Sequence, residues 1–137
     1  MPGYPAGMAG DKVETARRAL EALGAGEVVP LGGLVSRDVI WHVPGVHRFA
    51  GEFRGRDELV ELYQRMASED VRTAFEEIHA VVGDDEHVVA LIRAALSAPG
   101  GTVPMRSVVV LHFEGDDVAE GWTMNDRQDE IDLVIGR

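Results

Sequence analysis

The chain has 137 residues and carries a formal net charge of −11, from 13 basic and 24 acidic residues. This length is typical of one domain with a hydrophobic core of its own. Nucleic-acid binding needs a basic face, and anionic membrane surfaces repel an acidic chain, so we expect neither partner. The absence of cysteine excludes disulfides, thiolate metal sites and cysteine nucleophiles. Composition alone indicates no particular reaction.

The N-terminal half is predicted to be mainly helical. Residues 1–10 have neither a charged n-region nor an apolar h-region, so we expect a disordered segment there, no signal peptide, and a cytoplasmic domain over residues 11–137. Hydrophobic periodicity and turn residues then predict a helix over 12–24, a short helical turn or loop over 28–36, a strand over 38–43, a loop over 46–55 and a helix over 56–68.

The C-terminal half has the pattern of a β-meander. Strands are predicted over residues 72–82, 86–96, 102–113 and 118–124, and the segments between them are rich in Gly, Pro and Asp. This order of elements predicts an α+β fold, with an antiparallel sheet and helices on one of its faces.

The predicted strand over residues 86–96 is apolar on both faces, and so is the next one. Val89 and Leu91 point one way, while neighbours such as Val88 and Ile92 point the other. An antiparallel sheet with one solvated face would alternate between apolar and polar residues. Either this chain covers both faces, or a second subunit covers one. We favour a homodimer through the outer sheet face, because so short a chain lacks the residues for a second covering layer.

Three segments resemble the SnoaL-like branch of the NTF2-like superfamily, which includes polyketide cyclases and ketosteroid isomerase. They are Val39–Gly45, Phe49–Leu59, and Phe113–Trp122 followed by Asp126. The resemblance implies an NTF2-like (cystatin-like) cone, in which N-terminal helices wrap a curved antiparallel sheet around an apolar pocket. It also implies homodimers through the outer sheet face, as in many members. A fold of this kind does not specify one reaction.

The resemblance implies a catalytic role for Asp126, because SnoaL-like cyclases use an Asp near the end of the last strand as acid and base. A carboxylate in an apolar cavity has a raised pKa, which suits it to removing a proton next to a carbonyl. The alternative is an ordinary surface Asp at a strand end. We expect Asp126→Asn to abolish turnover without affecting folding if the first interpretation holds.

Trp41 and His42 are neighbours on the predicted strand, so they face opposite sides of the sheet. Trp41 shares a face with Val39 and Val43 and is a candidate pocket wall, but a bend at Pro44 would change this. His42 is either a pocket residue or a hydrogen-bonded structural histidine. Ketosteroid isomerases carry their catalytic Asp in this segment and a Tyr in helix one, and this chain has neither, which argues against their mechanism.

Arg93, Arg106 and Asn125 form a further group. Symmetric hairpins would place Arg93 opposite Arg106, and Arg106 opposite Asn125. Like charges directly opposite destabilise a sheet, so a carboxylate is expected nearby, with Asp126 and Glu77 as candidates. The group is either a salt-bridge cluster or an anion or oxyanion site.

Limonene epoxide hydrolases on this fold use an Asp–Arg–Asp arrangement, with one Asp two residues after the Arg. The corresponding positions here are Ala95 and Val108. This departure argues against that epoxide-hydrolase chemistry.

His79 and His112 lie on different predicted strands and would converge with His42 only if all three faced the cavity. Their spacing matches no metal-binding motif, so we expect no metal and no cofactor. Tyr63, Met66 and Trp122 are interpreted as cavity lining or as core.

Two functions from different classes follow. The first is a cofactor-independent enzyme that transfers protons on a hydrophobic, carbonyl-containing small molecule, as a polyketide cyclase or isomerase does. Asp126 would be its acid and base, with His42, His112 or Asn125 polarising the carbonyl. The second is a non-catalytic small-molecule-binding or accessory domain. The predicted pocket consists of Trp41, Tyr63, Met66, His79, Arg106, Trp122 and Asn125.

Overall fold

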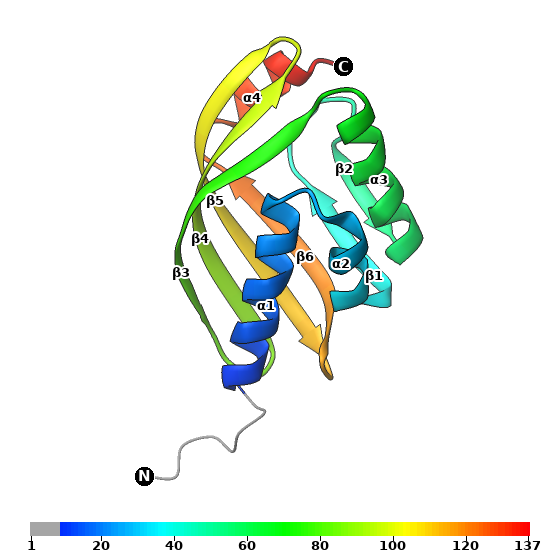
Figure 1. Ribbon diagram of the computed structural model, residues 1–137, viewed down its shortest axis with the longest axis vertical. Coiled ribbons are helices and arrows are strands. Elements are labelled where there is room, and N and C mark those ends of the chain that lie inside the picture. Colours follow the sequence, from blue (N-terminus) through cyan, green and yellow to red (C-terminus); the bar gives the residue numbers. More distant parts are fainter. Residues whose placement is uncertain (1–8) are drawn as a thin grey trace.

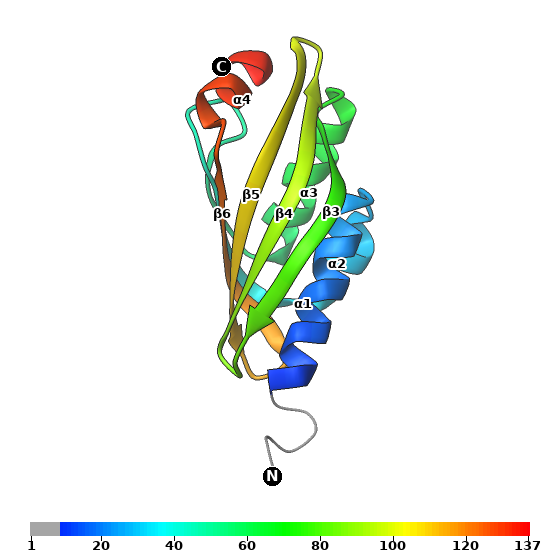
Figure 2. The ribbon, with the colours of Figure 1, turned by 90° about the vertical axis from the view of Figure 1, so that its left-hand side faces the viewer.

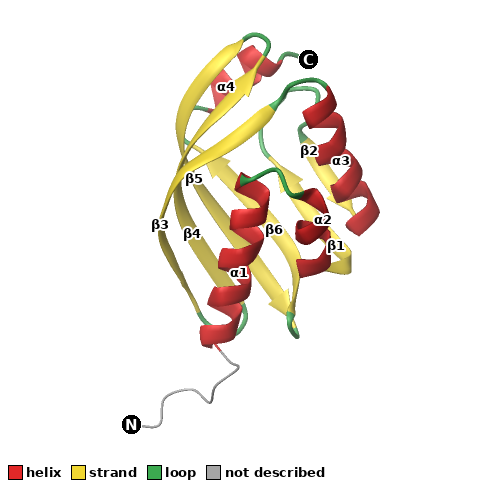
Figure 3. Ribbon diagram, viewed as in Figure 1, coloured by secondary structure: helices red, strands yellow, loops and turns green. Residues whose placement is uncertain are grey.

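The computed structural model describes residues 9–137. The segment expected to be disordered, residues 1–10, lies outside the described residues except for residues 9 and 10, which instead form the start of a helix. The elements follow one another as shown in Figures 1 and 3. In chain order they are α1 (Ala9–Gly24), α2 (Val28–Leu34), β1 (Val35–Val43), β2 (Gly51–Arg54), α3 (Arg56–Ser68), β3 (Arg72–Gly83), β4 (His87–Ala98), β5 (Gly101–Glu114), β6 (Asp117–Asn125) and α4 (Gln128–Ile135).

The strands form one six-stranded sheet in the order β2-β1-β6-β5-β4-β3. Strands β3 to β6 are a meander, joined by tight turns, as the sequence predicted. The sheet is mixed rather than wholly antiparallel, because β1 pairs in parallel with β6. The chain makes β1 early, crosses to the far edge through α3, and returns by the meander until the last strand lies beside β1.

The sheet is curved, and α1, α2 and α3 lie on its concave side (Figure 2). Helix α1 packs against β3, and α3 packs against β1 and β2. The burial pattern of β4 explains this arrangement: every second residue from Val88 to Leu96 is buried beneath the helices. The cystatin-like cone that the resemblance implied is therefore present. None of the helices among residues 9–137 is long and apolar enough to span a membrane.

Two elements were not predicted from the sequence. Strand β2 lies in the segment expected to be a loop; it has only four residues and is held by pairing with β1, where Phe53 lies opposite Trp41. Helix α4 follows the last strand and buries Ile131 and Ile135. The backbone N–H of Arg48 donates to the carbonyl of Gly136, 3.0 Å away, and ties the end of α4 to the loop after β1. Both elements depend on partners distant in sequence.

The convex, outer face of the sheet is open to solvent in the single chain. Val82 is 60% exposed, Leu91 42% and Met124 51%. The first of the two interpretations, in which one chain covers both faces, does not describe this structure. The homodimer remains a prediction.

Candidate functional site: an apolar cavity with two polar regions

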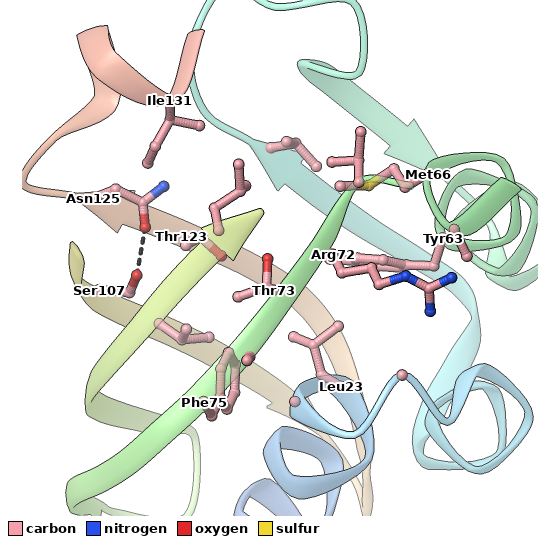
Figure 4. A pocket seen from close by; sticks show the side chains of 18 of the residues that line it. Leu23, Tyr63, Met66, Arg72, Thr73, Phe75, Ser107, Thr123, Asn125 and Ile131 are labelled. Carbon is pink, nitrogen blue, oxygen red and sulfur yellow. Dashed lines mark hydrogen bonds between the residues drawn. The ribbon is translucent and has the colours of Figure 1, made fainter. Parts of the chain in front are cut away.

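A cavity of about 390 Å³ lies between the concave face of the sheet and the helices (Figure 4). Its walls come from the C-terminal end of α1, from the other three helices, and from every strand except β2. Most lining side chains are apolar, among them Leu23, Met66, Phe75 and Ile131. This size and lining are typical of pockets for small hydrophobic molecules.

Trp41 forms part of the cavity wall and is 2% exposed. It lies beside Gly121 in the parallel β1–β6 pair, and a Cβ atom on Gly121 would collide with the indole ring. Glycine therefore provides the space that the ring occupies. Since strand residues alternate, Trp41 faces the cavity and His42 faces the outer side.

The first polar region of the cavity is the hydroxyl of Tyr63, on α3. The indole Nε1–H of Trp41 donates to this oxygen over 3.2 Å. Burial raises the pKa of Tyr63 to about 12, although the Trp41 hydrogen bond acts in the opposite direction. The phenol is thus protonated at neutral pH. Its oxygen already accepts from Trp41, and its proton has no acceptor among residues 9–137, so it is available to a molecule in the cavity.

The second polar region is Ser107, on β5, with Asn125, on β6. The Ser107 hydroxyl is 2.5 Å from Asn125 Oδ1, as the dashed line in Figure 4 marks. Asn125 Nδ2 donates to Gln128 Oε1 over 2.9 Å, and Gln128 Nε2 donates to Asp132 Oδ1 over 2.9 Å. We call this series, Ser107–Asn125–Gln128–Asp132, the amide chain. It links the cavity wall to α4.

His47 also lines the cavity, is 6% exposed, and was not singled out from the sequence. Its Nδ1 accepts a hydrogen bond from the Phe49 backbone N–H, 3.1 Å away, and a further hydrogen bond joins the ring to the backbone of Pro44. Burial lowers the pKa of His47, and the nearby Asp132 only partly offsets this effect. His47 is therefore a neutral histidine that holds the turn after β1. No motif in the sequence would have revealed this role.

The model of the SnoaL-like domain family matches residues 16–121, most of the chain. The chain belongs to this family. The match ends before Thr123 and Asn125, so part of the cavity wall and all of α4 lie beyond it.

Solved structures with this fold agree with the family assignment. A Xanthomonas campestris protein of unknown function with a cystatin-like fold is 25% identical, with a TM-score of 0.84 over 92% of this chain and 98% of that one. A putative polyketide cyclase from X. campestris pv. campestris is 14% identical, with a TM-score of 0.76 over 93% and 98%. An M. tuberculosis LEH-like epoxide hydrolase is 18% identical, with a TM-score of 0.71 over 93% and 92%. No curated protein matches the chain in sequence.

The last two of these likenesses concern the fold alone. They place the SnoaL-like domain among proteins described as a cyclase and as an epoxide hydrolase, but they assign no reaction to it.

In the SnoaL-like domain, Asp126 lies outside the cavity. It is exposed, and its Oδ1 accepts a hydrogen bond from the Arg106 backbone N–H, 2.9 Å away. The cause is a one-residue register shift in the β5–β6 hairpin. Near the turn Phe113 pairs with Val118, but the next pair is His112 with Glu120, so one residue of β6 is skipped. A symmetric hairpin would place Asp126 opposite Met105, which lines the cavity. The shift by one residue reverses the face of everything that follows it.

The same shift corrects the predicted partner of Asn125, which lies opposite Ser107 rather than Arg106. Asn125 consequently faces the cavity. Arg106 is exposed on the other face, opposite Arg93 as expected. Glu76 and Glu77 lie 3.3 and 3.4 Å from the Arg93 guanidinium. This group is an exposed salt-bridge cluster away from the cavity.

His42, His79 and His112 also lie away from the cavity. His42 Nε2 is 2.6 Å from Glu120 Oε2, and its ring stacks on Trp122 with 5.3 Å between centroids. His112 Nδ1 is 3.2 Å from His87 Nε2, and the exposed His79 bonds its neighbour Glu77. Of the residues suggested by the sequence, the cavity brings together Trp41, Tyr63, Met66 and Asn125.

Proposed function

We propose that this SnoaL-like domain binds a hydrophobic small molecule that carries a carbonyl group. The observation that supports it is the Trp41–Tyr63 pair. Because the indole N–H donates to Tyr63, the phenol proton is directed away from Trp41 and is free to donate to a carbonyl oxygen. Most of the lining side chains are apolar, with Arg72, Thr73 and Thr123 as polar exceptions, so such a hydrogen bond would meet less competition from water than one at the surface.

The geometry favours binding over proton transfer. Among the described residues that line the cavity, the one carboxylate is that of the exposed Glu27, at the end of the α1–α2 connection. His47 Nδ1 is already occupied by the Phe49 N–H. A mechanism through Asp126 would require its carboxylate to leave the Arg106 N–H and reach the opposite face of the sheet. A cavity that supplies a polarising donor without a converging base is suited to retaining its ligand unchanged.

Proton transfer of the cyclase or isomerase type is the second candidate. It is favoured by Tyr63, because a phenol that keeps its proton stabilises the negative charge that develops on a carbonyl oxygen during enolisation. The fold is also that of a protein described as a putative polyketide cyclase.

One experiment distinguishes these candidates. Methyl naphthyl ketone, a rigid aromatic carbonyl compound, is titrated by calorimetry into the protein and into the variants Tyr63→Phe and Asp126→Asn. We expect binding to weaken by roughly tenfold in Tyr63→Phe, the usual effect of losing one buried hydrogen bond, and to be unchanged in Asp126→Asn. Equal affinity of the wild type and Tyr63→Phe would refute the proposed binding mode.

The same samples report on catalysis. In deuterated buffer, a base in the cavity would exchange the methyl protons next to the carbonyl, and proton NMR would follow their loss. We expect no acceleration over buffer. Exchange that disappears in Asp126→Asn would instead establish the acid/base enzyme.

We also propose that a second copy of the chain covers the outer sheet face. The partly exposed Leu91 and Met124 support this, since contiguous apolar surface on a small domain is costly in water. Leu91→Arg is expected to shift the mass measured by light scattering from dimer to monomer. A monomeric wild type would refute the proposal.

A further inference from the structure

The amide chain has a fixed direction, and this direction determines what Ser107 offers to a ligand. A carboxylate oxygen only accepts hydrogen bonds, so the Gln128 group facing Asp132 must be the Nε2 amide nitrogen. The Gln128 oxygen then faces Asn125 and must be met by Nδ2. This leaves Asn125 Oδ1 facing Ser107, whose hydroxyl must donate its proton to that oxygen.

Ser107 therefore has no proton to give to a molecule in the cavity. Its Oγ keeps lone pairs and acts as an acceptor. The side chain lines the cavity and is 4% exposed, so an unpaired acceptor facing a bound apolar group would be costly. Tyr63 presents the opposite character, a proton without an acceptor. Figure 4 shows Ser107 and Tyr63 on opposite sides of the cavity, with Thr123, Thr73 and Arg72 between them in this view and Phe75 and Leu23 below.

We propose that the ligand carries a hydroxyl group at the end opposite its carbonyl, and that this hydroxyl donates to Ser107 Oγ. The inference rests on the proposed function, because it takes the carbonyl to lie at Tyr63. A hydroxyl suits the region further, since its own oxygen is able to accept the second Nδ2 proton of Asn125. An ether or a second carbonyl would place two acceptor oxygens against each other. The ligand class is thus an apolar molecule with a carbonyl at one end and a hydroxyl at the other.

The turn after β1 is shaped around the amide chain. Gly45 has a φ of +101°, and a Cβ atom there would collide with the side chains of Asp132 and Gln128. Any residue other than glycine would both strain this backbone and displace the two residues that set the direction of the chain. The sequence indicates only a strand end at Pro44–Gly45. In the structure, Gly45 leaves the space in which Asp132 accepts the hydrogen bond from Gln128 and so sets the direction of the amide chain.

The test compares three probes of the same ring system by calorimetric titration: methyl naphthyl ketone, its derivative with a hydroxyl at the far end of the rings, and the methyl ether of that derivative. We expect the hydroxyl compound to bind roughly tenfold more tightly than the methyl ether, because the ether leaves Ser107 without a donor. Ser107→Ala should bring these two affinities together. Tyr63→Phe should weaken all three probes and leave their ratios unchanged.

Asp132→Asn tests the direction of the chain separately. An Asn at this position is able to donate or accept, so Gln128 and Asn125 are free to rotate and Ser107 is free to donate. We expect the preference for the hydroxyl probe over the methyl ether to fall several-fold, with little change in the affinity for the parent ketone. A purely structural role for Asp132 would weaken all three probes alike, and that result would overturn the inference. Thermal melting of Ser107→Ala and Asp132→Asn confirms that both variants fold.

The outcomes separate this inference from the proposed function. If the parent ketone binds through Tyr63 and the added hydroxyl gives no gain, the inference is wrong and the proposed function stands. If none of the probes binds, both are wrong.

Discussion

Gly121 is the residue on which the position of Trp41 depends, and Gly121→Ala tests this directly. The added Cβ would overlap the six-membered part of the indole ring of Trp41, where the Cζ3 and Cε3 atoms would lie closest to it. The ring is 2% exposed and is also held by its hydrogen bond to Tyr63, so the space open to it is the cavity that it lines. The overlap must be relieved by tilting the indole into the cavity or by separating β1 from β6.

The expected cost follows from overpacking a buried site, which is about 1–3 kcal/mol. Replacing a glycine in a strand by alanine returns part of this, about 0.5–1 kcal/mol, through the lower entropy of the unfolded chain. The net loss is then between about 0 and 2.5 kcal/mol, with a middle value of about 1 kcal/mol, which for a domain of this size lowers Tm by roughly 4 °C. Gly33→Ala is the matched control. A Cβ there meets nothing within 4 Å, so we expect Tm to stay the same or to rise.

The assay combines thermal unfolding with the fluorescence of Trp41 in a Trp122→Phe background, so that one tryptophan reports. Gly121→Ala should change the emission maximum of Trp41 and weaken the binding of methyl naphthyl ketone, because the tilted ring occupies cavity volume. An unchanged Tm together with unchanged emission would refute the reasoning, since it would mean that Gly121 does not determine where the ring lies.

Three further predictions use other parts of the structure. Burial raises the pKa of Tyr63 to about 12, above its ordinary value of 10.0. The stability that the protonated phenol contributes is therefore complete below pH 10 and is lost as the pH rises toward 12. In Tyr63→Phe we expect the free energy of unfolding to fall less over this range, and an identical fall would contradict the assignment. Burial lowers the pKa of His47 from 6.5, so the stability that its neutral ring contributes is complete above that pH and is lost as the pH falls below it. His47→Gln should show a shallower decline of Tm between roughly pH 6.5 and 5. A decline parallel to that of the wild type would argue against a neutral buried imidazole. On α4, Ile131→Ala should cost about 2–4 kcal/mol in chemical denaturation, whereas Leu133→Ala, at a side chain that is 82% exposed, should cost less than about 0.5 kcal/mol; similar costs would mean that α4 is not packed as described.

Most elements of the fold were predictable from the sequence because their signals are local. Helix α3 was predicted with the bounds that it has, and the four meander strands agree within two residues at each end. Periodicity and turn residues act within a few positions, so they are legible without knowledge of the rest of the chain. The Arg93–Arg106 pairing was also correct, because the β4–β5 hairpin is symmetric about its turn.

The elements that were missed have non-local causes. Strand β2 exists because β1 supplies its hydrogen bonds, and α4 exists because its buried isoleucines close one end of the cavity. Helix α2 contains Pro30, Gly32 and Gly33, which disfavour a helix, yet it forms between α1 and α3. In each case tertiary packing overrides a weak or opposing local preference.

The sequence by itself determined that the chain holds an α+β domain of SnoaL-like type, with an excess of acidic residues and no cysteine chemistry. Only the tertiary structure decided which polar side chains meet in the cavity. A single register shift in the β5–β6 hairpin turns Asn125 inward and Asp126 outward. Side chains alternate with a period of two, so one extra residue exchanges the two faces of a strand, and nothing in the local sequence indicates whether it is present.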